Sequence, residues 1–319
     1  MALVEVLQMS VLAPLVVILG PTASGKSALA IQLARRLNGE VLVCDSTQVY
    51  RHFDIGTAKV PLAEQEGIAH HLVDLVEPDE LFTAGEYRRQ ALMVLTEVSQ
   101  RGKLPILTAG TGLYLRALLE GLADAPERSE ELRARLRAKA QLHGADYLHR
   151  TLARLDPENA RRIAPRDTQK VIRAIEMRIL AGKPVEEIHR AGRNSLEGYH
   201  VQKIGLSPPR AALYARIDAR TVAMLSDGWL DEVRRLSSSG IPPDAKPFQF
   251  IGYPELLAHL LGRLTMEAAT KKIQLVTRQF AKRQLTWFRK EPSVHWLPGF
   301  GDDPEVGAAA LGLLQTPRA

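Results

Sequence analysis

The sequence contains a single cysteine, Cys44, and no hydrophobic run long enough to cross a membrane. One thiol cannot form an intramolecular disulfide or a thiolate metal cluster, so a disulfide scaffold and a zinc ribbon are excluded and a reducing compartment is favoured. The longest apolar run, residues 11–19, contains Pro14 and follows no basic region, and it is shorter than the ~20 apolar residues of a membrane helix. We therefore expect a soluble cytoplasmic protein with no membrane partner.

The sequence also lacks a strong excess of any one class of residue. Aromatic residues make up only 5% of the chain, hydrophobic residues 45% and charged residues 24%, and the 19 prolines are spread along it. This composition excludes a disordered, collagen-like or coiled-coil chain and predicts a globular one. Because single cores stop growing at about 250–300 residues, a chain of 319 residues is expected to have an oversized core or an inserted lobe.

Basic residues are segregated along the chain, although the formal net charge is only +6. Residues 128–193 contain 16 Lys+Arg against 9 Asp+Glu, residues 271–290 contain 7 against none, and the remainder is acidic. Two concentrated basic segments are typical of proteins that bind a polyanion such as a nucleic acid. Solvated Arg-rich helix faces are the alternative that charge alone leaves open.

The hydrophobic pattern predicts a parallel α/β core. An apolar strand over residues 11–19 ends at Gly20, a helix follows over residues 27–37, and a second strand over residues 41–44 ends at Asp45. The other expected strands are residues 71–76, 104–107 and 200–206, and the other expected helices are residues 84–100, 113–119, 210–225, 229–236, 253–261 and 265–289.

Beyond residue 122 the pattern changes to Arg-rich amphipathic helices without a convincing strand. We therefore predict an α/β fold, with a parallel sheet flanked by helices and an all-helical domain inserted in it. The glycine-rich sequence GPTASGKS at residues 20–27 makes this core resemble that of P-loop NTPases. The first part of the core is predicted over residues 10–122, the inserted helical domain over 123–199, and the second part of the core, with C-terminal basic helices, over 200–299. We expect the first eight residues and the tail after Gly299 to be frayed.

One motif carries a specific chemistry. It matches G-x-x-x-x-G-K-[ST] in full and lies between a predicted strand and a predicted helix, as a phosphate loop does. In such a loop the backbone N–H groups and the helix N-terminus surround an anionic phosphate, the lysine contacts phosphate oxygens, and the serine hydroxyl binds Mg²⁺. The motif leaves the diphosphate compound unspecified. Its residues are Gly20, Pro21, Thr22, Ala23, Ser24, Gly25, Lys26 and Ser27.

Asp45 follows the second predicted strand directly. In an open α/β sheet the carboxyl ends of the strands face one crevice, so we expect Asp45 to lie near the phosphate loop and to act as a proton acceptor. A Mg²⁺ ligand or a helix N-cap, made by Asp45 or Ser46, is the alternative. Cys44 beside it is expected to be a buried strand residue rather than a nucleophile.

These residues occur within a longer series of motifs, in order from about residue 13 to residue 290, that closely resembles the bacterial tRNA dimethylallyltransferases. The resemblance implies transfer of a dimethylallyl group from dimethylallyl diphosphate to N6 of adenosine 37, next to the anticodon of tRNA. Pyrophosphate is released, Mg²⁺ is required, and the phosphate loop holds the isoprenoid diphosphate instead of ATP. The motifs begin at Asp45 (DSTQVYR), Ile55 (IGTAK), His70 (HHLVD), Ala109 (AGTGLY), Gln169 (QKVIRAIE), Ile251 (IGYPE) and Thr277 (TRQFAKRQ).

The resemblance also implies roles for single residues. Asp45 accepts a proton from the adenine amine, Thr22 and Lys26 hold the departing diphosphate, and Ser27 binds its Mg²⁺. An arginine adds positive charge, for which Arg220 is the candidate, with Arg216 one turn earlier as the alternative. Ser46 and Gln48 help to seat the base, and Thr111 lines the channel in which donor and base meet.

An adenine in an RNA loop must be extruded from its stack to react, and phosphate contacts must hold the stem-loop around it. We therefore expect the tRNA anticodon stem-loop to contact both basic segments, with Tyr253, Trp287 and Phe288 either stacking on bases or lying in the core. Because no cysteine pair follows Cys44, we expect the bacterial form, without the C-terminal zinc finger of eukaryotic relatives. We expect a monomer, because the RNA already bridges both lobes. The expected tRNA-binding residues are Asp45, Ser46, Thr47, Gln48, Thr111, Arg133, Gln169, Lys170, Val171, Ile172, Arg173, Phe248, Gln249, Tyr253, Arg278, Lys282 and Arg283.

Two functions of other classes compete with this one. In a small-molecule P-loop kinase, Asp45 would activate a hydroxyl and the basic insert would be a lid over ATP. The excess of positive charge in residues 128–193 is larger than a lid requires. A non-catalytic RNA-binding protein with a degenerate loop is disfavoured because Lys26 and Ser27 are both intact.

Overall fold

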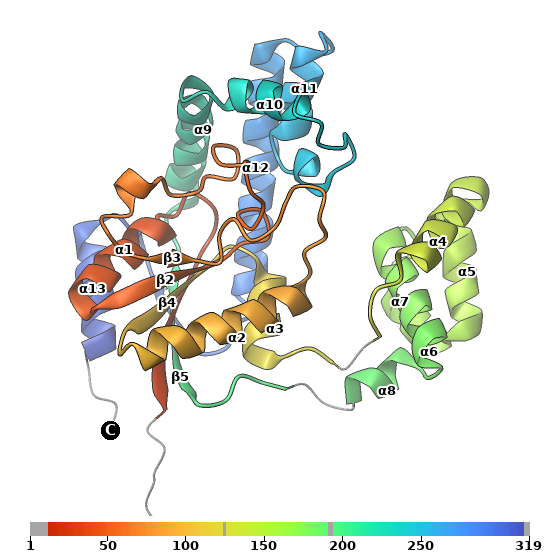
Figure 1. Cartoon of the computed structure of the whole chain (residues 1–319), viewed down its shortest axis with the longest axis horizontal. Coiled ribbons are helices and arrows are strands. Elements are labelled where there is room, and N and C mark those ends of the chain that lie inside the picture. The colour runs from red at the N-terminus through yellow and green to blue at the C-terminus, as the bar shows by residue number, and fades with distance from the viewer. Residues whose placement is uncertain (1–11, 124–125, 191–193, 316–319) are drawn as a thin grey trace, which may run out of the picture. The chain divides into compact units, whose positions relative to one another are not determined.

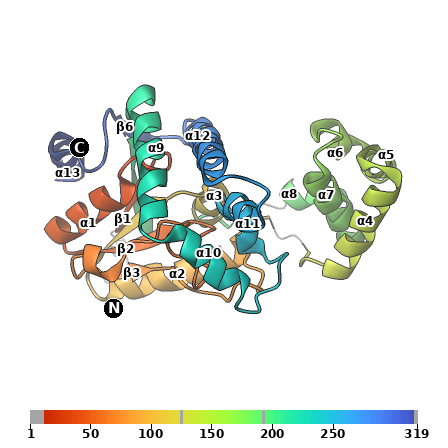
Figure 2. The same cartoon turned by 90° about the horizontal axis from the view of Figure 1, so that it is seen from above.

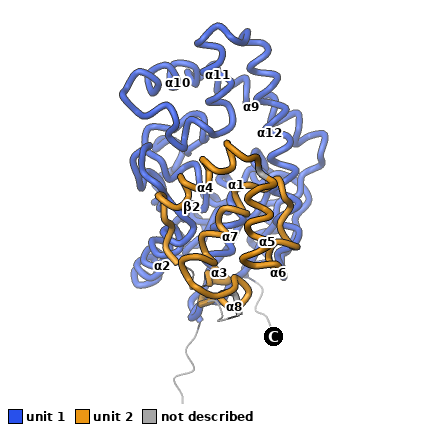
Figure 3. The backbone as a smooth tube through the Cα atoms, turned by 90° about the vertical axis from the view of Figure 1, so that its right-hand side faces the viewer, with its two compact units in different colours: residues 1–118, 197–319 blue, residues 119–196 orange. Residues whose placement is uncertain are grey.

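The computed structural model describes residues 12–123, 126–190 and 194–315. The chain divides into two compact units (Figure 3). The sheet unit combines the described residues up to Leu118 with those from Glu197 onward, and the helical unit is Leu119–Leu196. Among the described residues, none of the helices combines the length and the hydropathy that a membrane span requires.

A parallel sheet forms the centre of the sheet unit (Figure 1). It has six strands in the order β3-β2-β4-β1-β5-β6. This arrangement confirms the predicted α/β class. In the register of the sheet, Ala109 at the end of β4 is the partner of both Leu19 in β1 and Cys44 in β2. The three strands therefore end at the same level, and the loops that follow them start side by side. The strands are β1 Ala13–Leu19, β2 Gly39–Cys44, β3 His70–His71, β4 Leu104–Ala109, β5 Tyr199–Leu206 and β6 Val294–Leu297.

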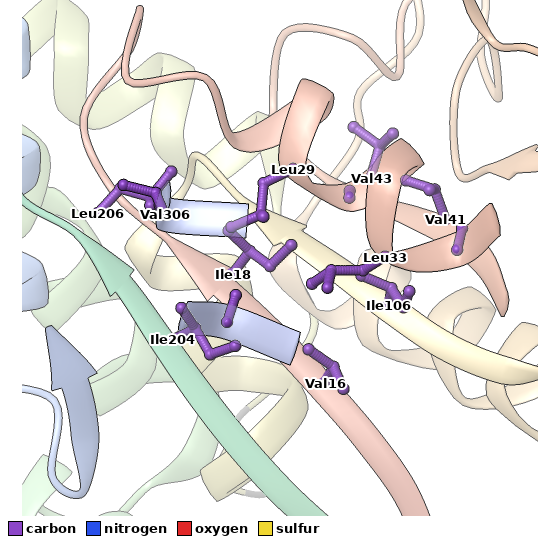
Figure 4. Packing of buried hydrophobic residues seen from close by; sticks show 13 residues of the cluster. Val16, Ile18, Leu29, Leu33, Val41, Val43, Ile106, Ile204, Leu206 and Val306 are labelled. Carbon is purple, nitrogen blue, oxygen red and sulfur yellow. The ribbon is translucent and has the colours of Figure 1, made fainter. Parts of the chain in front are cut away.

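Helices cover both faces of this sheet. The side chains of Val16, Ile18 and Ile106 meet Leu29 and Leu33 of α1 in a fully buried cluster (Figure 4). The alternate strand residues point to the opposite face, where α2 contacts β2 and β4. The helices of the unit are α1 Lys26–Leu37, α2 Ala84–Gln100, α3 Gly112–Glu120, α9 Arg210–Ser226, α10 Trp229–Ser237, α11 Tyr253–Leu260, α12 Met266–Phe288 and α13 Pro304–Gln315, with short 3₁₀ turns at Leu62–Glu64 and Lys246–Gln249.

Two expectations about the sheet unit are wrong. The tail after Gly299 contains the helix α13, Pro304–Gln315, whose Val306 and Ala310 are buried in the cluster that α1 forms with the sheet. Figure 2 shows α13 beside α1. The strand expected over residues 71–76 ends at His71, because Leu72 and Asp74 adopt left-handed backbone angles, with φ of 66° and 53°, that a strand cannot contain. The first eight residues lie outside the described part of the chain.

The described part of the helical unit contains five helices and no strand. Three of these helices begin at polar caps: Ser129, Asp156 and Asp167 accept a hydrogen bond from a backbone N–H of the first turn of α4, α6 and α7, respectively. Leu136, Leu148, Val171 and other apolar residues form a separate small core. The helices are α4 Glu130–His143, α5 Ala145–Leu155, α6 Pro157–Arg162, α7 Thr168–Ala181 and α8 Val185–Arg190.

Candidate active site

The phosphate loop runs from the end of β1 into α1. Ala23 and Gly25 have positive φ, 63° and 85°, which curl the backbone back on itself. The ammonium group of Lys26 donates hydrogen bonds to the carbonyls of Gly20 and Pro21, both at 2.9 Å. These bonds fix Lys26 across the loop, at the position where a phosphate-binding lysine is required.

The carboxylate of Asp45 lies next to this loop and is held in one orientation. The backbone N–H and the hydroxyl of Thr47 donate to Oδ1 of Asp45 at 2.9 and 2.7 Å, which is a local turn and no helix cap. Oδ2 lies 2.4 Å from the position that a Cβ on Gly110 would occupy, so only glycine fits there. In the described part of the chain Oδ2 accepts no hydrogen bond, which leaves it available as a proton acceptor.

The turn after β4 completes this side of the site. The hydroxyl of Thr111 accepts a hydrogen bond from the N–H of Ser46 at 2.9 Å and lies 3.2 Å from the Ser46 hydroxyl. The side-chain amide of Gln48 donates to the carbonyls of Thr57 and Ala58 at 3.1 and 3.3 Å. The structure therefore brings together the predicted residues of β1, β2 and β4.

Arg220 of α9 contributes a second cation. Burial lowers the pKa of Lys26 to about 8, while Asp45 raises it and Arg220 lowers it again. Burial also lowers the pKa of Arg220, against an increase caused by Asp45 and with a further decrease caused by Arg216. Two cations and one carboxylate thus interact in a partly buried site with a surplus of positive charge, as an anionic ligand requires.

The alternative candidate, Arg216, has another partner. Its guanidinium forms two hydrogen bonds with the carboxylate of Asp302, at 2.6 and 2.5 Å, and lies 4.0 Å from the centre of the Phe300 ring. Because Asp302 neutralises Arg216, the geometry favours Arg220 as the arginine that faces Asp45.

Sequence reasoning missed two further parts of the site. The N–H of Gly301 donates to the carbonyl of Ser24 at 2.8 Å, so the C-terminal segment supports the phosphate loop. Gln284 of α12 bonds to Thr22 and to Gly110. A signal for Gln284 exists in the sequence: it lies three residues after Ala281 and four before Phe288, on the buried stripe of the helix.

The expected tRNA-binding residues differ in their exposure to solvent. Gln169, Lys170, Gln249, Lys282 and Arg283 are exposed. The side chains of the apolar members, Val171, Ile172 and Phe248, are buried in hydrophobic clusters, and their contact with tRNA stays a prediction. Two of the three candidate stacking rings are buried as well.

Tyr253 and Phe288 are both fully buried and therefore lie in the core. The hydroxyl of Tyr253 donates to the carboxylate of Glu232 at 2.7 Å, and Glu232 also accepts the backbone N–H groups of Asp54, Ile55 and Gly56. Tyr253 thus holds a loop instead of a base. Trp287 is 37% exposed, with the guanidinium of Arg116 4.8 Å from its ring centre.

Three of the expected tRNA-binding residues are arginines that form internal ion pairs. Arg133 and Arg173 both bind the fully buried carboxylate of Glu176, at 2.8 and 2.6 Å. Burial raises the pKa of Glu176, but hydrogen bonds from Arg133, Arg173 and the N–H of Ser129 outweigh this effect and hold the pKa at about 2. Arg278 pairs with Asp218 of α9 at 2.6 Å. The side chain of Arg133 is only 11% exposed and is engaged within the helical unit, and its assignment as a tRNA contact stays a prediction.

Comparison with known proteins identifies the relatives of this chain. The family model described as IPP transferase matches residues 48–291. The chain belongs to this family. A tRNA dimethylallyltransferase of Solibacter usitatus is 50% identical over 93% of this chain and 97% of its own length, and one of Koribacter versatilis is 48% identical over 95% and 98%.

Solved structures agree with this membership. The tRNA isopentenylpyrophosphate transferase of Bacillus halodurans is 38% identical, with a TM-score of 0.68 over 95% of this chain and 97% of that chain. A eukaryotic dimethylallyltransferase, captured acting on tRNA, is 29% identical, with a TM-score of 0.80 over 94% of this chain and 78% of that chain. The resemblance, the transferase class and the tRNA-modifying function that the sequence predicts are confirmed by these similarities.

Proposed function

We propose that this chain transfers a dimethylallyl group from dimethylallyl diphosphate to N6 of adenosine 37 in tRNA and releases pyrophosphate. The observation that carries the proposal is that Lys26 and Asp45 follow β1 and β2, which end at the same level of the sheet, and that the charge of Arg220 on α9 acts on both of them. An anionic leaving group and a nucleophile that must lose a proton need these charges at one place.

In the reaction, N6 of adenine attacks the allylic carbon, the new C–N bond forms, and the C–O bond to the diphosphate breaks. The electron pair of that bond leaves with pyrophosphate. The surplus proton on N6 passes to Oδ2 of Asp45, because Thr47 already occupies Oδ1. The allylic carbon is itself activated, so the protein has to neutralise the leaving group and orient a weak nucleophile.

The residues of the phosphate loop hold the diphosphate. Lys26 and Arg220 supply positive charge, and the N-terminus of α1 adds its dipole. Ser27, the second residue of α1, is exposed and offers a hydroxyl to Mg²⁺. Among the described residues no group of three or more acidic, histidine or cysteine side chains could hold a metal. This fits Mg²⁺, which keeps several waters and binds one or two protein groups together with substrate phosphates. The ion would neutralise charge on the diphosphate.

The polar residues around Asp45 are proposed to seat the base. Ser46 and Thr111 place hydroxyl groups next to Asp45, Gln48 follows three residues after Asp45 in the same loop, and extrusion of the adenine would bring its amine to Oδ2. Lys282 and Arg283 on α12, with Gln169 and Lys170 on α7, are the exposed residues proposed to contact the anticodon stem-loop. We propose that the enzyme acts as a cytoplasmic monomer.

A direct assay tests this proposal. Purified protein is incubated with unmodified anticodon stem-loop RNA, dimethylallyl diphosphate and Mg²⁺, and the digested nucleosides are weighed by mass spectrometry, with ATP as the donor in a parallel reaction. We expect one adenosine to gain a five-carbon unit only when the isoprenoid donor is present. Phosphate transfer from ATP without any prenylated adenosine would instead identify a kinase.

A further inference from the structure

The side chain of Gln284 joins three elements that are distant in the sequence. Gln284 lies on α12 and is only 6% exposed. Its Oε1 accepts a hydrogen bond from the backbone N–H of Thr22 at 2.7 Å, and its Nε2 donates to the carbonyl of Gly110 at 2.8 Å. One amide therefore connects α12, the phosphate loop after β1 and the turn after β4.

On one side, Gln284 supports the phosphate loop. Thr22 directly precedes Ala23, whose left-handed φ of 63° is unfavourable for a residue with a side chain. A backbone in such a conformation persists when surrounding groups hold it, and the bond from Thr22 to Gln284 is one such contact. Because Gln284 engages the N–H of Thr22, the hydroxyl is the group that Thr22 offers to a ligand.

On the other side, Gln284 supports the residues around Asp45. Oδ2 of Asp45 lies against Gly110, whose carbonyl Gln284 binds. The N–H groups of Gly110 and Thr111 both donate to the carbonyl of Cys44 at 3.0 Å, which ties this turn to the end of β2. A shift of Gly110 would therefore move the surroundings of the proton acceptor.

We propose that Gln284 is a positioning residue that holds the phosphate loop and the Asp45 side of the site at a fixed separation. This inference rests on the proposed function, because that separation sets the distance between the leaving diphosphate and the amine that attacks. Glutamine suits the role, since its amide is both an acceptor for Thr22 and a donor for Gly110 at the same reach.

Three variants test the role. Gln284→Met keeps the volume of the side chain and removes both hydrogen bonds. Gln284→Glu keeps the length and the acceptor, but it removes the donor and places a negative charge beside the phosphate loop. The matched control is Gln274→Met on the same helix, which removes a bond to the carbonyl of Asp218 (3.2 Å) and keeps the bonds of Gln284 to Thr22 and Gly110.

We expect Gln284→Met to lower kcat about 10- to 100-fold, because small misplacements of reacting groups reduce rates by such factors. Its affinity for the stem-loop RNA should stay within twofold of the wild type, since Lys282 and Arg283 are exposed and do not depend on the amide. The control should keep the wild-type kcat. Gln284→Glu should lower kcat and also raise the KM for dimethylallyl diphosphate.

The role is wrong if Gln284→Met retains kcat within twofold of the wild type. The role is also wrong if Gln284→Met lowers kcat, RNA affinity and melting temperature together and Gln274→Met lowers kcat by the same factor. Where Gln284→Met does not fold, Gln284→Glu decides: a wild-type kcat and KM would overturn the role. Product mass from the wild-type enzyme is measured first, so the absence of prenylated adenosine would contradict the proposed function and not the role of Gln284.

Discussion

Lys26 is a residue of the candidate site whose ionisation depends on the fold. A lysine with its ordinary pKa of 10.5 stays charged throughout the physiological range, but burial lowers the pKa of Lys26 to about 8. Its charge, on which we propose that binding of the diphosphate depends, is therefore lost at mildly alkaline pH. Arg220 keeps its charge at the same pH, because a guanidinium does not lose its proton in proteins.

We expect kcat/KM for dimethylallyl diphosphate to fall as pH rises through about 8. Above this value free Lys26 is neutral, and the diphosphate loses one of its cations. The bound diphosphate favours the charged form, so kcat at saturating donor should fall only at higher pH. Initial rates between pH 6.5 and 9.5 at low and at saturating donor check this, and a kcat/KM that stays constant up to pH 9.5 would contradict it.

Asp45 is expected to matter for the chemical step and little for folding. Asp45→Asn keeps the shape of the side chain but provides no base, so kcat should fall about 10²- to 10⁴-fold. Single-turnover rates with bound RNA measure this effect. Asp231→Asn, at an exposed carboxylate paired with Arg234, is the matched control and should be neutral. Near-normal turnover of Asp45→Asn would exclude a proton-accepting role.

At the scale of elements, the packing of α4 on α7 depends on the ion pairs of Glu176. The partners are 43 residues apart for Arg133 and three apart for Arg173, and the carboxylate is fully buried. The charge of Glu176 is tolerated only because both guanidinium groups and the N–H of Ser129 surround it. These arginines therefore stabilise the helical unit.

We expect Arg133→Met to destabilise the helical unit by about 3–5 kcal/mol, because it leaves a buried carboxylate without its main partner. Arg135→Met is the matched control, since Arg135 pairs with Glu131 on the exposed surface. Denaturant melts of both variants measure the difference. Equal stability of the two variants would show that the pair is dispensable.

The depressed pKa of Glu176 also predicts an acid transition. Its contribution to stability is fully present above the ordinary pKa of 4.5 and is lost as the pH falls through about 2. A shift of this size corresponds to about 3 kcal/mol. Denaturant melts of the wild type and Glu176→Gln between pH 6 and pH 2 should show that the variant does not lose this contribution to stability. A parallel loss in both proteins would assign the transition to other carboxylates.

The basic residues of α12 differ in their partners within the protein. Lys282 and Arg283 are exposed, whereas Arg278 is paired with Asp218. We expect the double variant Lys282→Ala, Arg283→Ala to reduce the salt dependence of RNA binding, by about 0.7–0.9 in slope for each phosphate that is no longer neutralised. Arg278→Met should leave the slope unchanged. Binding titrations at several salt concentrations decide, and the opposite pattern would assign the phosphate-binding role to Arg278.

At the scale of the whole molecule, the C-terminal segment, from β6 to α13, packs against the rest of the sheet unit. β6 pairs with β5, and α13 buries Val306 and Ala310 against α1. The N–H of Gly301 donates to the carbonyl of Ser24 in the phosphate loop. The last part of the chain therefore supports the first part of the active site.

Truncation after Pro298 is expected to lower stability by about 3 kcal/mol or more, because it exposes the apolar face of α1. It should also raise the KM for dimethylallyl diphosphate, since the phosphate loop loses the bond from Gly301. Thermal melts and donor titrations test both effects, with RNA affinity as the internal control. A truncated enzyme with the wild-type melting temperature and KM would show that the segment is dispensable.

The sequence by itself determined the features that depend on residues close together along the chain. Apolar runs that end at Gly20 and Asp45 predict parallel strands, and the spacing from Gly20 to Ser27 predicts the phosphate loop, because backbone conformation and helix dipoles are local properties. The motifs shared with the IPP transferases indicated the reaction. The placement of Asp45 beside Lys26 also followed, since parallel strands end at a common edge.

Only the tertiary structure decided the partners of the long polar side chains. Arg216 binds Asp302 at a separation of 86 residues, Arg278 binds Asp218 at 60, and Gln284 binds Thr22 at 262. A pattern of charges shows which residues are basic but not which of them are neutralised within the protein. That outcome depends on which elements pack together, because an ion pair or a buried amide forms where non-local packing brings a partner within about 3 Å.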